Sequence, residues 1–502
     1  MNNGKICVSV SAETAEEMLD KVARASEFAD IIEIRFDSLR PEDVSKVLEN
    51  VTSKKNLLAT FRSTEQGGKR DLTLTERIAF WGRVNDTFWA DTEEDLADTS
   101  INSVLRVASY HNFVDSDSNL DEIFERLARS GDIVKIAVNS DDICDTLPIW
   151  KLLKRSTEEK KPFVPIAMGD AGKWTRILAP AHGAFMTYAS LDSGSETAPG
   201  QITAKDMTNV YRVKELDKNT QVFGVIGNPI SQSMSPYMHN PSFEQTGINA
   251  VFLSLLVKNI DEFMRRMVKP RSREVELNFG GFSVTMPHKQ AIMPHLDAID
   301  PTAEKIGAVN TVKIKDGKLT GYNTDAHGFI TPLKARFPDL KDARVAVIGA
   351  GGAARAVVFA LKAEAARVKV FARNLDKATA FAEEFEVVSG AVSGLCRPDT
   401  RISDSFDIVV DTTPTGMKGP HEDESLLTAA ELDGVKLVYD LVTKPNDTPI
   451  LREARIAGSE VVGGLEMLIA QGAKQFEIWT GKVAPVAIMT ESIVRRFAEL
   501  NK

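Results

Sequence analysis

The segment ARVAVIGAGGAARAVVFAL (343–361) decides the fold of the second half of the chain. It opens with an apolar run typical of a buried strand, turns through closely spaced glycines, and ends in a run typical of a helix. Glycines at such a turn let the backbone approach a pyrophosphate, which binds at the helix N-terminus. The flanking strand and helix provide the context that a dinucleotide site requires. We therefore predict a Rossmann lobe whose cofactor-binding turn comprises Gly349, Ala350, Gly351, Gly352 and Ala353.

The next apolar run, VKVFAR (368–373), indicates which dinucleotide binds. Sites that prefer NAD carry Asp or Glu near the end of this strand, where the carboxylate accepts from the ribose 2′-hydroxyl. Here Arg373 and Asn374 occupy that place, and Lys377 follows on the next helix. Because a cation matches a 2′-phosphate, we predict NADP as the cofactor. The alternative is that Arg373 is an ordinary solvent-exposed residue.

Composition and charge limit the function classes. The chain has 502 residues, which corresponds to about three domains. Its formal net charge of −10 argues against a nucleic-acid partner, which would need a basic face to neutralise phosphates. We expect small-molecule substrates instead, and no metal ion.

The compartment is predicted from absences in the sequence. The three cysteines, Cys7, Cys144 and Cys396, are far apart and odd in number, which favours a reducing compartment over a disulfide framework. The N-terminus has no features of a signal or transit peptide. No apolar run approaches the ~18 residues that span a bilayer. We therefore expect a cytoplasmic protein without a membrane partner, of bacterial rather than plastid type.

Short apolar strands alternate with amphipathic helical stretches through the first 215 or so residues. Alternating strands and helices imply parallel pairing, and eight such units suggest a closed (β/α)₈ barrel, the TIM barrel. The predicted strands are 6–10, 31–37, 56–62, 88–93, 104–111, 132–138, 163–169 and 185–190. The fourth, FWADTE, has the weakest pattern, and the units around it are uneven in length.

Charged side chains gather toward the carboxyl ends of these strands, where barrels of this type place their active sites. A buried strand should be apolar, so we interpret five such side chains as a site rather than as structural ion pairs. They are Glu33, Arg35, Arg62, His111 and Lys135.

A polar linker, KELDKNT (214–220), separates the barrel from the rest of the chain. The strand pattern restarts at VFGVIGNPI (222–230), and an amphipathic helix is predicted near 483–499. We predict an α/β protein with a barrel at 1–216, a substrate-binding lobe at 221–324 and the Rossmann lobe at 325–473. A C-terminal helix over 474–502 is expected to complete the substrate-binding lobe.

From residue 222 onward the chain resembles the shikimate dehydrogenases. The matching motifs, in family order, are GNPISQSMSPYMHN (227–240), FSVTMPHK (282–289), IGAVNTV (306–312), GYNTDAHGF (321–329), VIGAGGAAR (347–355), DTTPTGM (411–417) and GLEMLIAQGA (464–473).

This resemblance implies roles for residues outside the glycine turn. Lys289 and Asp325 would form the catalytic pair, which fits a ketone reduction because the developing alkoxide needs a proton and a positive charge. Taken alone, the two residues would more often be a surface salt bridge. Ser233 and Ser235 would bind the substrate carboxylate. The ring hydroxyls would contact Thr285, Asn310 and Gln471, and the cofactor would also contact Leu441 and Gly464.

The dehydrogenase half departs from the family pattern at three positions. Thr443 stands where a tyrosine is expected, which would remodel one substrate hydrogen bond. Asn374 follows Arg373 where threonine is common, and Asp411 stands where asparagine is common.

The first 215 residues resemble the type I 3-dehydroquinate dehydratases, a (β/α)₈ family. The matches are EIRFD (33–37), TFRSTEQGG (60–68), VASYHNF (107–113), DIVKIAV (132–138), AMGDAGKWTRI (167–177) and TAPGQI (197–202). On this resemblance Lys135 condenses with the substrate ketone to an imine, and His111 acts as general base and acid. Arg176 would pair with the substrate carboxylate. The remaining site residues would be Ser9, Glu33, Arg35, Arg62, Thr197 and Gln201.

The dehydratase half has its own departures. Gln66 stands directly before Gly-Gly, where the family usually has Glu, and Glu65 lies one position earlier. Either the acid is dispensable or Glu65 replaces it through a local shift. Thr197 replaces a common serine and keeps the hydroxyl.

The two resemblances together imply consecutive steps of the shikimate pathway, because the product of the dehydratase is the substrate of the dehydrogenase. One alternative is a catabolic, NAD-linked quinate/shikimate dehydrogenase, against which Arg373 argues. Another is a non-catalytic sensor of quinate-like ligands. A sensor could lose its catalytic side chains, whereas Lys135, His111, Lys289 and Asp325 are all present.

Overall fold

The computed structural model describes residues 2, 4–114, 119–395 and 401–500. The chain divides into two compact units, residues 1–236 with 247–279 and residues 237–246 with 280–502. Each unit is described by itself below.

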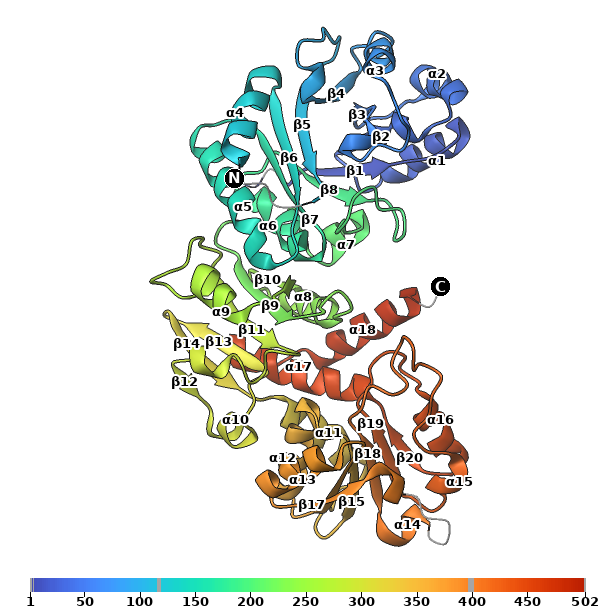
Figure 1. Cartoon of the computed structure of the whole chain (residues 1–502), viewed down its shortest axis with the longest axis vertical. Helices are drawn as coiled ribbons and strands as arrows, with labels where there is room; N and C mark the ends of the chain where they lie inside the picture. Colours follow the sequence, from blue (N-terminus) through green and yellow to red (C-terminus); the bar gives the residue numbers. More distant parts are fainter. Residues whose placement is uncertain (1, 3, 115–118, 396–400, 501–502) are drawn as a thin grey trace. The chain divides into compact units, whose positions relative to one another are not determined.

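The first unit contains the predicted barrel, and the fold class is confirmed. Eight parallel strands follow the order β7-β6-β5-β4-β3-β2-β1-β8 (Figure 1). Between β7 and β8, the backbone N–H of Phe185 donates to the carbonyl of Phe163 at 2.8 Å, so the barrel is nearly closed. The strands are β1 (Ile6–Val10), β2 (Ile31–Arg35), β3 (Asn56–Thr60), β4 (Phe88–Glu93), β5 (Arg106–Asn112), β6 (Ile133–Asn139), β7 (Phe163–Met168) and β8 (Thr187–Ser190).

Helices follow most of the strands on the outside of the barrel. They are α1 (Ala15–Ala25), α2 (Pro41–Asn50), α3 (Leu74–Trp81), α4 (Leu120–Ser130), α5 (Leu147–Glu158), α6 (Lys173–Leu178) and α7 (Ala204–Asn209). After β4 the described chain forms only the 3₁₀ turn η3 (Glu94–Leu96) before β5. This missing helix explains the uneven unit lengths in the sequence around FWADTE.

The first unit also includes a parallel pair that follows the linker, β9 (Gln221–Gly227) and β10 (Ala250–Leu256). After β10 come the short helix α9 (Ile260–Phe263) and the π-helical turn η7 (Met264–Val268). The predicted restart of the strand pattern at 222–230 is therefore confirmed.

The second unit begins its sheet with an antiparallel arrangement. β11 (Phe279–Val284) pairs with β13 (Thr311–Lys315), which pairs with β14 (Lys318–Tyr322), and β12 (Ala298–Ile299) runs parallel to β14. The helices of this part are α8 (Ser235–Gln245), α10 (Pro301–Ile306) and α11 (Asp325–Arg336).

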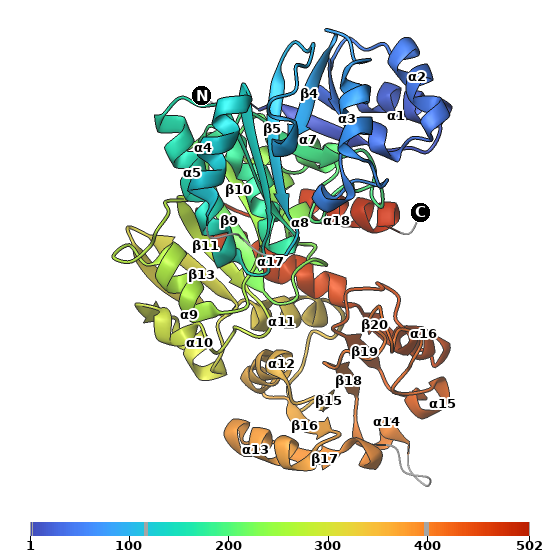
Figure 2. The same ribbon diagram turned by 45° about the horizontal axis from the view of Figure 1, so that its top comes forward.

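A six-stranded parallel sheet forms the predicted Rossmann lobe. Its order is β17-β16-β15-β18-β19-β20 (Figure 2). The strand that comes first in the sequence, β15, therefore lies at the centre of the sheet, as in other dinucleotide-binding sheets. The strands are β15 (Arg344–Ile348), β16 (Arg367–Ala372), β17 (Val388–Ala391), β18 (Ile408–Asp411), β19 (Leu437–Asp440) and β20 (Glu460–Val462). The helices are α12 (Gly352–Ala363), α13 (Leu375–Phe385), α14 (Ile402–Ser405), α15 (Ala429–Leu432) and α16 (Pro449–Ile456).

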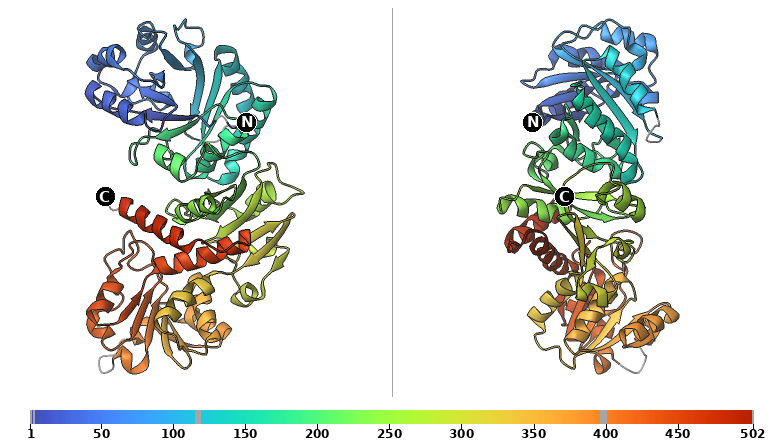
Figure 3. Two further views of the ribbon diagram at one scale, coloured as in Figure 1. Left: turned by 180° about the vertical axis from the view of Figure 1, so that it is seen from behind. Right: turned by 90° about the vertical axis from the view of Figure 1, so that its left-hand side faces the viewer.

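The prediction of one C-terminal helix over 474–502 is wrong. The chain forms two helices, α17 (Gly464–Thr480) and α18 (Val486–Leu500), drawn in red in Figure 3. Gly481 ends α17 in the left-handed conformation, with φ of 70°, which satisfies the last carbonyls of the helix and turns the chain. The separate prediction of an amphipathic helix near 483–499 matches α18.

None of the helices in the described part of the chain has the length and apolar character that a membrane span requires. Cys7 and Cys144 are buried free thiols, and Cys396 lies outside the described residues.

Candidate active sites

A narrow pocket inside the barrel collects most of the residues predicted for the dehydratase site. Eight of the predicted side chains line it, and the ninth, Ser9, donates its hydroxyl to Glu33. The eight are Glu33, Arg35, Arg62, His111, Lys135, Arg176, Thr197 and Gln201.

Lys135 lies deeper than the sequence predicts. It is the third residue of β6, not its last, and its side chain is only 3 % exposed. Its Nζ donates to Tyr188 Oη at 3.1 Å, lies 3.5 Å from Glu33 Oε1, and lies 4.1 Å from the centre of the Tyr188 ring. Glu33 is likewise the third residue of β2. The prediction that both lie at strand ends is therefore wrong, because inward-facing side chains of a barrel also fill the layers below its mouth.

Asp91 lies in the same network, although the sequence analysis does not predict it. Its carboxylate, on β4, accepts from Lys135 Nζ at 2.8 Å and from Arg62 at 2.6 Å, and Ser109 Oγ donates to it at 2.5 Å. Burial opposes ionisation, but the charges of Arg62 and Lys135 outweigh it and lower the pKa of Asp91 to about 2. The carboxylate therefore fixes the amine and the guanidinium in one buried network.

His111 lies near the end of β5 against the Arg62 guanidinium. Arg62 Nη1 is 2.8 Å from His111 Nδ1. Burial and the positive charges of Arg62, Lys135 and Arg35 lower the pKa of His111 well below its ordinary value. The imidazole is therefore neutral near pH 7, which is the state that a general base needs.

The position of Gln66 decides between the two alternatives for the missing acid. Gln66 lines the pocket, and its Oε1 accepts from the backbone N–H of His111 at 2.8 Å. Glu65 is exposed and is not among the residues that line the pocket. The local shift that would bring Glu65 into the site does not occur.

The pocket is also lined by an arginine, Arg176, that has few partners among the described residues. Arg176 is 1 % exposed, and its Nη2 donates to the carbonyl of Pro199 at 3.2 Å. Burial lowers its pKa to about 10, the direction expected for a cation without a carboxylate beside it. Thr197 and Gln201 stand on the same loop, where the Thr197 N–H donates to Gln201 Oε1 at 2.8 Å. Such a guanidinium is suited to an anionic ligand group.

Arg35 is instead held by the protein. It forms two hydrogen bonds to Asp37, at 2.9 and 2.8 Å, and both side chains are buried. It also donates to the carbonyl of Gly67 at 3.0 Å. Arg35 therefore fixes the loop that carries Gln66.

The second unit holds the other predicted amine. Lys289 Nζ lies 2.5 Å from Asp325 Oδ2, and Asn310 Nδ2 donates to Asp325 Oδ1 at 2.7 Å. Asp325 begins α11, where its backbone N–H donates to Asn323 Oδ1 at 3.0 Å. Three segments far apart in the sequence therefore meet at one lysine–aspartate pair.

Gln471 reaches the same cluster from α17. Its Oε1 accepts from Thr324 Oγ1 at 3.4 Å, and Thr324 also contacts Asn310. Thr285 precedes Lys289 on the turn after β11, where its carbonyl accepts from the His288 N–H at 2.9 Å.

Ser233 and Ser235 lie in the first unit, which includes the first two residues of α8, and the Ser235 N–H donates to Ser233 Oγ at 3.3 Å. Their predicted contact with the substrate carboxylate stays a prediction.

The glycine turn after β15 fits a dinucleotide. Gly349 has φ of 112°, and a Cβ there would lie 2.3 Å from Thr412 Oγ1, so only glycine is tolerated. Nothing lies within 4 Å of a Cβ at Gly351 or Gly352, and Gly352 begins α12. The helix therefore presents its free N-terminal amides, next to Ala350 and Ala353, toward open space that a pyrophosphate can fill.

The three residues predicted to select NADP are exposed: Arg373 and Asn374 follow β16 directly, and Lys377 lies on α13. Arg373 has no ion-pair partner among the described residues. Asn374 caps α13, because its Oδ1 accepts from the Lys377 N–H at 2.9 Å.

The other two predicted cofactor contacts, Leu441 and Gly464, lie on the other side of the sheet centre. A Cβ at Gly464 would lie 2.3 Å from the carbonyl oxygen of Leu441. These two residues are thus in direct backbone contact.

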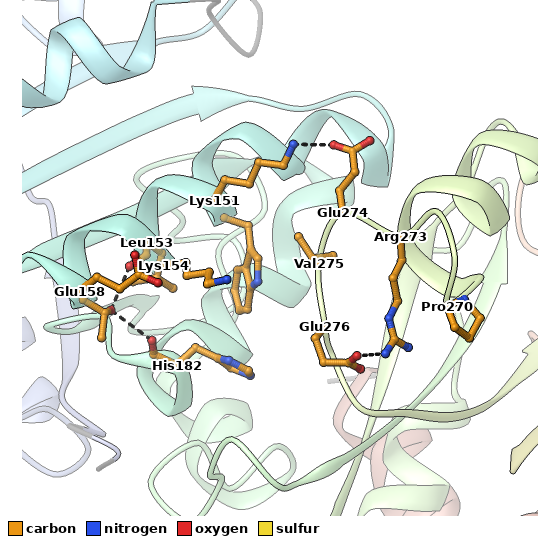
Figure 4. A pocket seen from close by; sticks show the side chains of 12 residues that line it. Lys151, Leu153, Lys154, Glu158, His182, Pro270, Arg273, Glu274, Val275 and Glu276 are labelled. Atoms are coloured by element: carbon orange, nitrogen blue, oxygen red, sulfur yellow. Dashed lines mark hydrogen bonds and ion pairs between the residues drawn. The ribbon is translucent and has the colours of Figure 1, made fainter. Parts of the chain in front are cut away.

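A larger cavity, of about 540 Å³, lies outside the barrel and contains none of the predicted residues (Figure 4). Its wall is formed by α5 and by residues 270–276 of the same unit. Lys151 pairs with Glu274, and Arg273 pairs with Glu276. These two cations of the wall are therefore already neutralised by carboxylates that line the same cavity.

The fold and the two sites define a two-part enzyme, with a buried-lysine lyase barrel joined to a dinucleotide-dependent oxidoreductase. Comparison with known families agrees. Residues 6–218 match type I 3-dehydroquinase, and 225–312 match the shikimate dehydrogenase substrate binding domain. Residues 332–426 match shikimate / quinate 5-dehydrogenase, and 464–493 match the shikimate 5′-dehydrogenase C-terminal domain. The chain belongs to the bifunctional 3-dehydroquinate dehydratase/shikimate dehydrogenase family.

Individual relatives support this assignment. A chloroplastic bifunctional 3-dehydroquinate dehydratase/shikimate dehydrogenase of Arabidopsis thaliana is 33% identical, over 96% of this chain and 83% of the relative. The NADP(+) shikimate dehydrogenase of Methanopyrus kandleri is 41% identical over 56% of this chain and 97% of its own length. A crystal structure of a shikimate dehydrogenase with NADP+ has a TM-score of 0.51 and 36% identity, covering 56% of this chain and 97% of that one. The predicted fusion, its two enzyme classes and NADP are confirmed.

Proposed function

We propose that the barrel dehydrates 3-dehydroquinate to 3-dehydroshikimate at Lys135, and that the second unit reduces this product to shikimate at Lys289. The observation that carries the proposal is the placement of two amines in two separate networks. Lys135 is buried against Asp91 and Tyr188 in the barrel, and Lys289 is paired with Asp325 beside Asn310.

The dehydration begins with condensation of the Lys135 ammonium group with the substrate ketone. Two of the three protons on nitrogen leave with the ketone oxygen as water, and an iminium ion forms. The iminium ion withdraws electrons, so the neighbouring C–H becomes acidic. Neutral His111 takes that proton, and the resulting imidazolium returns it to the departing hydroxyl, which leaves as a second water. Water then hydrolyses the iminium, so Lys135 is regenerated and the water released in the first step is consumed.

The remaining barrel residues bind the substrate. The buried guanidinium of Arg176 is assigned to the carboxylate, because it has no carboxylate partner in the described protein. The substrate hydroxyls and the shape of the pocket are assigned to Ser9, Glu33, Arg35, Arg62, Thr197 and Gln201.

In the reduction, bound NADPH supplies the hydride. Lys289 stabilises the developing alkoxide and donates a proton to it, and Asp325 holds the ammonium in place through the 2.5 Å contact. Asn310 and Gln471 approach the same pair and are assigned with Thr285 to ring hydroxyls. Ser233 and Ser235 are assigned to the carboxylate.

The chain's own residues would hold NADPH in three places. The pyrophosphate would lie over the turn 349–353, and the 2′-phosphate would contact Arg373, Asn374 and Lys377. Leu441 and Gly464 would flank the nicotinamide. The open space over Gly351 supports this assignment, as does the exposed guanidinium of Arg373, which has no ion pair with any residue that the structure describes.

We further propose three domains, at 1–216, 221–324 and 325–473, with residues 474–502 returning to the second domain. Hydrogen bonds support the return, since Gln475 Nε2 donates to Thr311 Oγ1 at 3.0 Å and Trp479 Nε1 donates to the Val312 carbonyl at 3.0 Å. A cytoplasmic location suits the buried free thiols of Cys7 and Cys144.

A coupled assay tests the proposal. Wild-type enzyme given 3-dehydroquinate and NADPH should lose NADPH absorbance. Lys135→Ala and Lys289→Ala should each abolish this signal, and added 3-dehydroshikimate should restore it only to Lys135→Ala. Mixing the two variants should also restore it, because each supplies the site that the other lacks. A signal from Lys135→Ala with 3-dehydroquinate alone would contradict the proposal.

A further inference from the structure

Two carboxyl groups lie side by side in the core of the dinucleotide-binding sheet, and none of the ion pairs between described residues involves either of them. Asp411 ends β18, Asp440 ends β19, and the two residues are directly opposite in the parallel register. Both are 0% exposed. Because side chains alternate along a strand, both point to the face of Val409 and Val438, which is an apolar core.

The hydrogen bonds of the two carboxyls are unequal. Asp440 is satisfied at both oxygens, by the Val442 N–H at 3.0 Å and by Thr448 Oγ1 at 2.5 Å. Asp411 accepts the Thr413 N–H at 2.8 Å through Oδ1, and its buried Oδ2 has no partner in the described structure. An ionised carboxylate with such an oxygen is costly, whereas a neutral acid is tolerated.

Both carboxyls hold backbone that touches the predicted cofactor contacts. Asp411 fixes Thr413, and a Cβ at Gly349 would lie 2.3 Å from Thr412 Oγ1 and 3.4 Å from Thr413 Cγ2. Asp440 fixes Val442, whose carbonyl oxygen would lie 2.5 Å from a Cβ at Gly464. Each carboxyl therefore holds a segment that adjoins one of the predicted cofactor contacts, Gly349 or Gly464.

We propose that Asp411 and Asp440 are a proton-sharing carboxyl pair that positions the segments 412–415 and 441–448 for NADPH binding, and that loss of the shared proton weakens this binding. The inference rests on the proposed NADPH-dependent reduction and adds two positioning residues to it. Neither residue has a role in the barrel's dehydration.

The electrostatics agree with this geometry. Burial, and then the neighbouring Asp440, raise the pKa of Asp411 to about 8, and burial raises the pKa of Asp440 to about 6. Apart from Asp440, the described groups in register with Asp411 or bonded to it are uncharged: Ile348 of β15, and Thr413. Between these two pKa values the pair holds one proton, and above them two adjacent buried charges repel each other.

Titration of NADPH into wild type and Asp411→Asn across about pH 6–10 tests the proposal. Wild-type affinity should fall by about tenfold per pH unit above the pKa of Asp411, since ionisation of one group sets the slope. Asp411→Asn should bind NADPH with little change over this range, because the amide keeps the Thr413 contact and cannot ionise. Asp440→Asn should move the loss to lower pH, because a carboxylate at 440 no longer opposes ionisation of Asp411. A wild-type curve that parallels Asp411→Asn would overturn the proposal.

Two further measurements distinguish a positioning role of Asp411 from a general loss of folded structure in the variants. Asp411→Ala loses the Thr413 contact, so it should bind NADPH weakly at every pH, and Asp411→Asn should rescue it. Thermal unfolding of the cofactor-free protein gives the second measurement. Between about pH 4 and 8, folded wild type keeps a proton on Asp411 that the unfolded chain has lost, so wild type should lose thermal stability relative to Asp411→Asn as the pH rises. The difference between the two unfolding midpoints should therefore grow over this range. A constant difference between the two unfolding midpoints would show that Asp411 is not held protonated.

The rate of dehydration serves as the control, and it should be equal in all these variants. Absence of reduction in wild type itself would count against the proposed function, not against the carboxyl pair.

Discussion

The replacement Asp91→Asn should destabilise the barrel and stop dehydration while leaving the reduction intact. Asp91 is the buried anion between Arg62, at 2.6 Å, and Lys135, at 2.8 Å. Its pKa falls from the ordinary 3.8 to about 2, which corresponds to about 2–3 kcal/mol of stabilisation of the carboxylate. Removing one partner of a buried ion pair costs about 3–5 kcal/mol, so we expect a loss of about 3 kcal/mol. The difference in stability between wild type and Asp91→Asn should reach its full size above about pH 4. It should vanish as the pH falls through about 2, because protonation then removes the same charge from wild type.

Urea unfolding at pH 7 measures this loss, and the matched control is Asp95→Asn in the same barrel. Asp95 also pairs with an arginine, Arg77, but its side chain is 47% exposed, so its replacement should cost no more than about 1 kcal/mol. Equal costs for the two variants would refute the assignment of Asp91 as the anion that holds the site together. Fluorescence reports mainly on the barrel, because it contains four of the five tryptophans, namely Trp81, Trp89, Trp150 and Trp174.

Three other replacements probe separate parts of the account. Gly349→Ala should abolish NADPH binding in a titration and spare dehydration, because its Cβ would clash with Thr412 Oγ1 at 2.3 Å; unchanged binding would contradict the assigned turn. Arg373→Ala should raise KM for NADPH by roughly 10–100-fold, as expected for one charge-assisted contact, and leave KM for NADH unchanged; equal changes for both cofactors would argue against a 2′-phosphate contact. Gln66→Glu should raise the pKa of His111 by placing a carboxylate beside it, so the acidic limb of the dehydration profile should move to higher pH; an unmoved limb would place the side chain at position 66 outside the reach of His111.

Much of the fold could be predicted because its signals are local. Buried parallel strands are apolar runs, and seven of the eight predicted barrel strands stand out from the sequence by that property alone. The glycine turn at 349–353 is equally local, since the strand, turn and helix are continuous. The break after Thr480 was missed, although Gly481 and the following Pro485 are signals of a helix end.

The candidate sites were only partly predictable because their contacts are long-range. Asp91 was missed since its partners Arg62 and Lys135 are 29 and 44 residues away, and only the strand register brings them together. The depth of Lys135 in the barrel also depends on where β6 begins, which an apolar run does not define. Lys289 and Asp325, 36 residues apart, were paired only through the family resemblance.

Borohydride reduction in the presence of 3-dehydroquinate, followed by peptide mass spectrometry, tests the central claim most directly. We predict that wild type and Lys289→Ala gain one substrate-derived adduct, located on Lys135, and that Lys135→Ala gains none. An adduct on Lys135→Ala, or one on a different lysine of the wild-type chain, would contradict the assignment of separate tasks to the two amines.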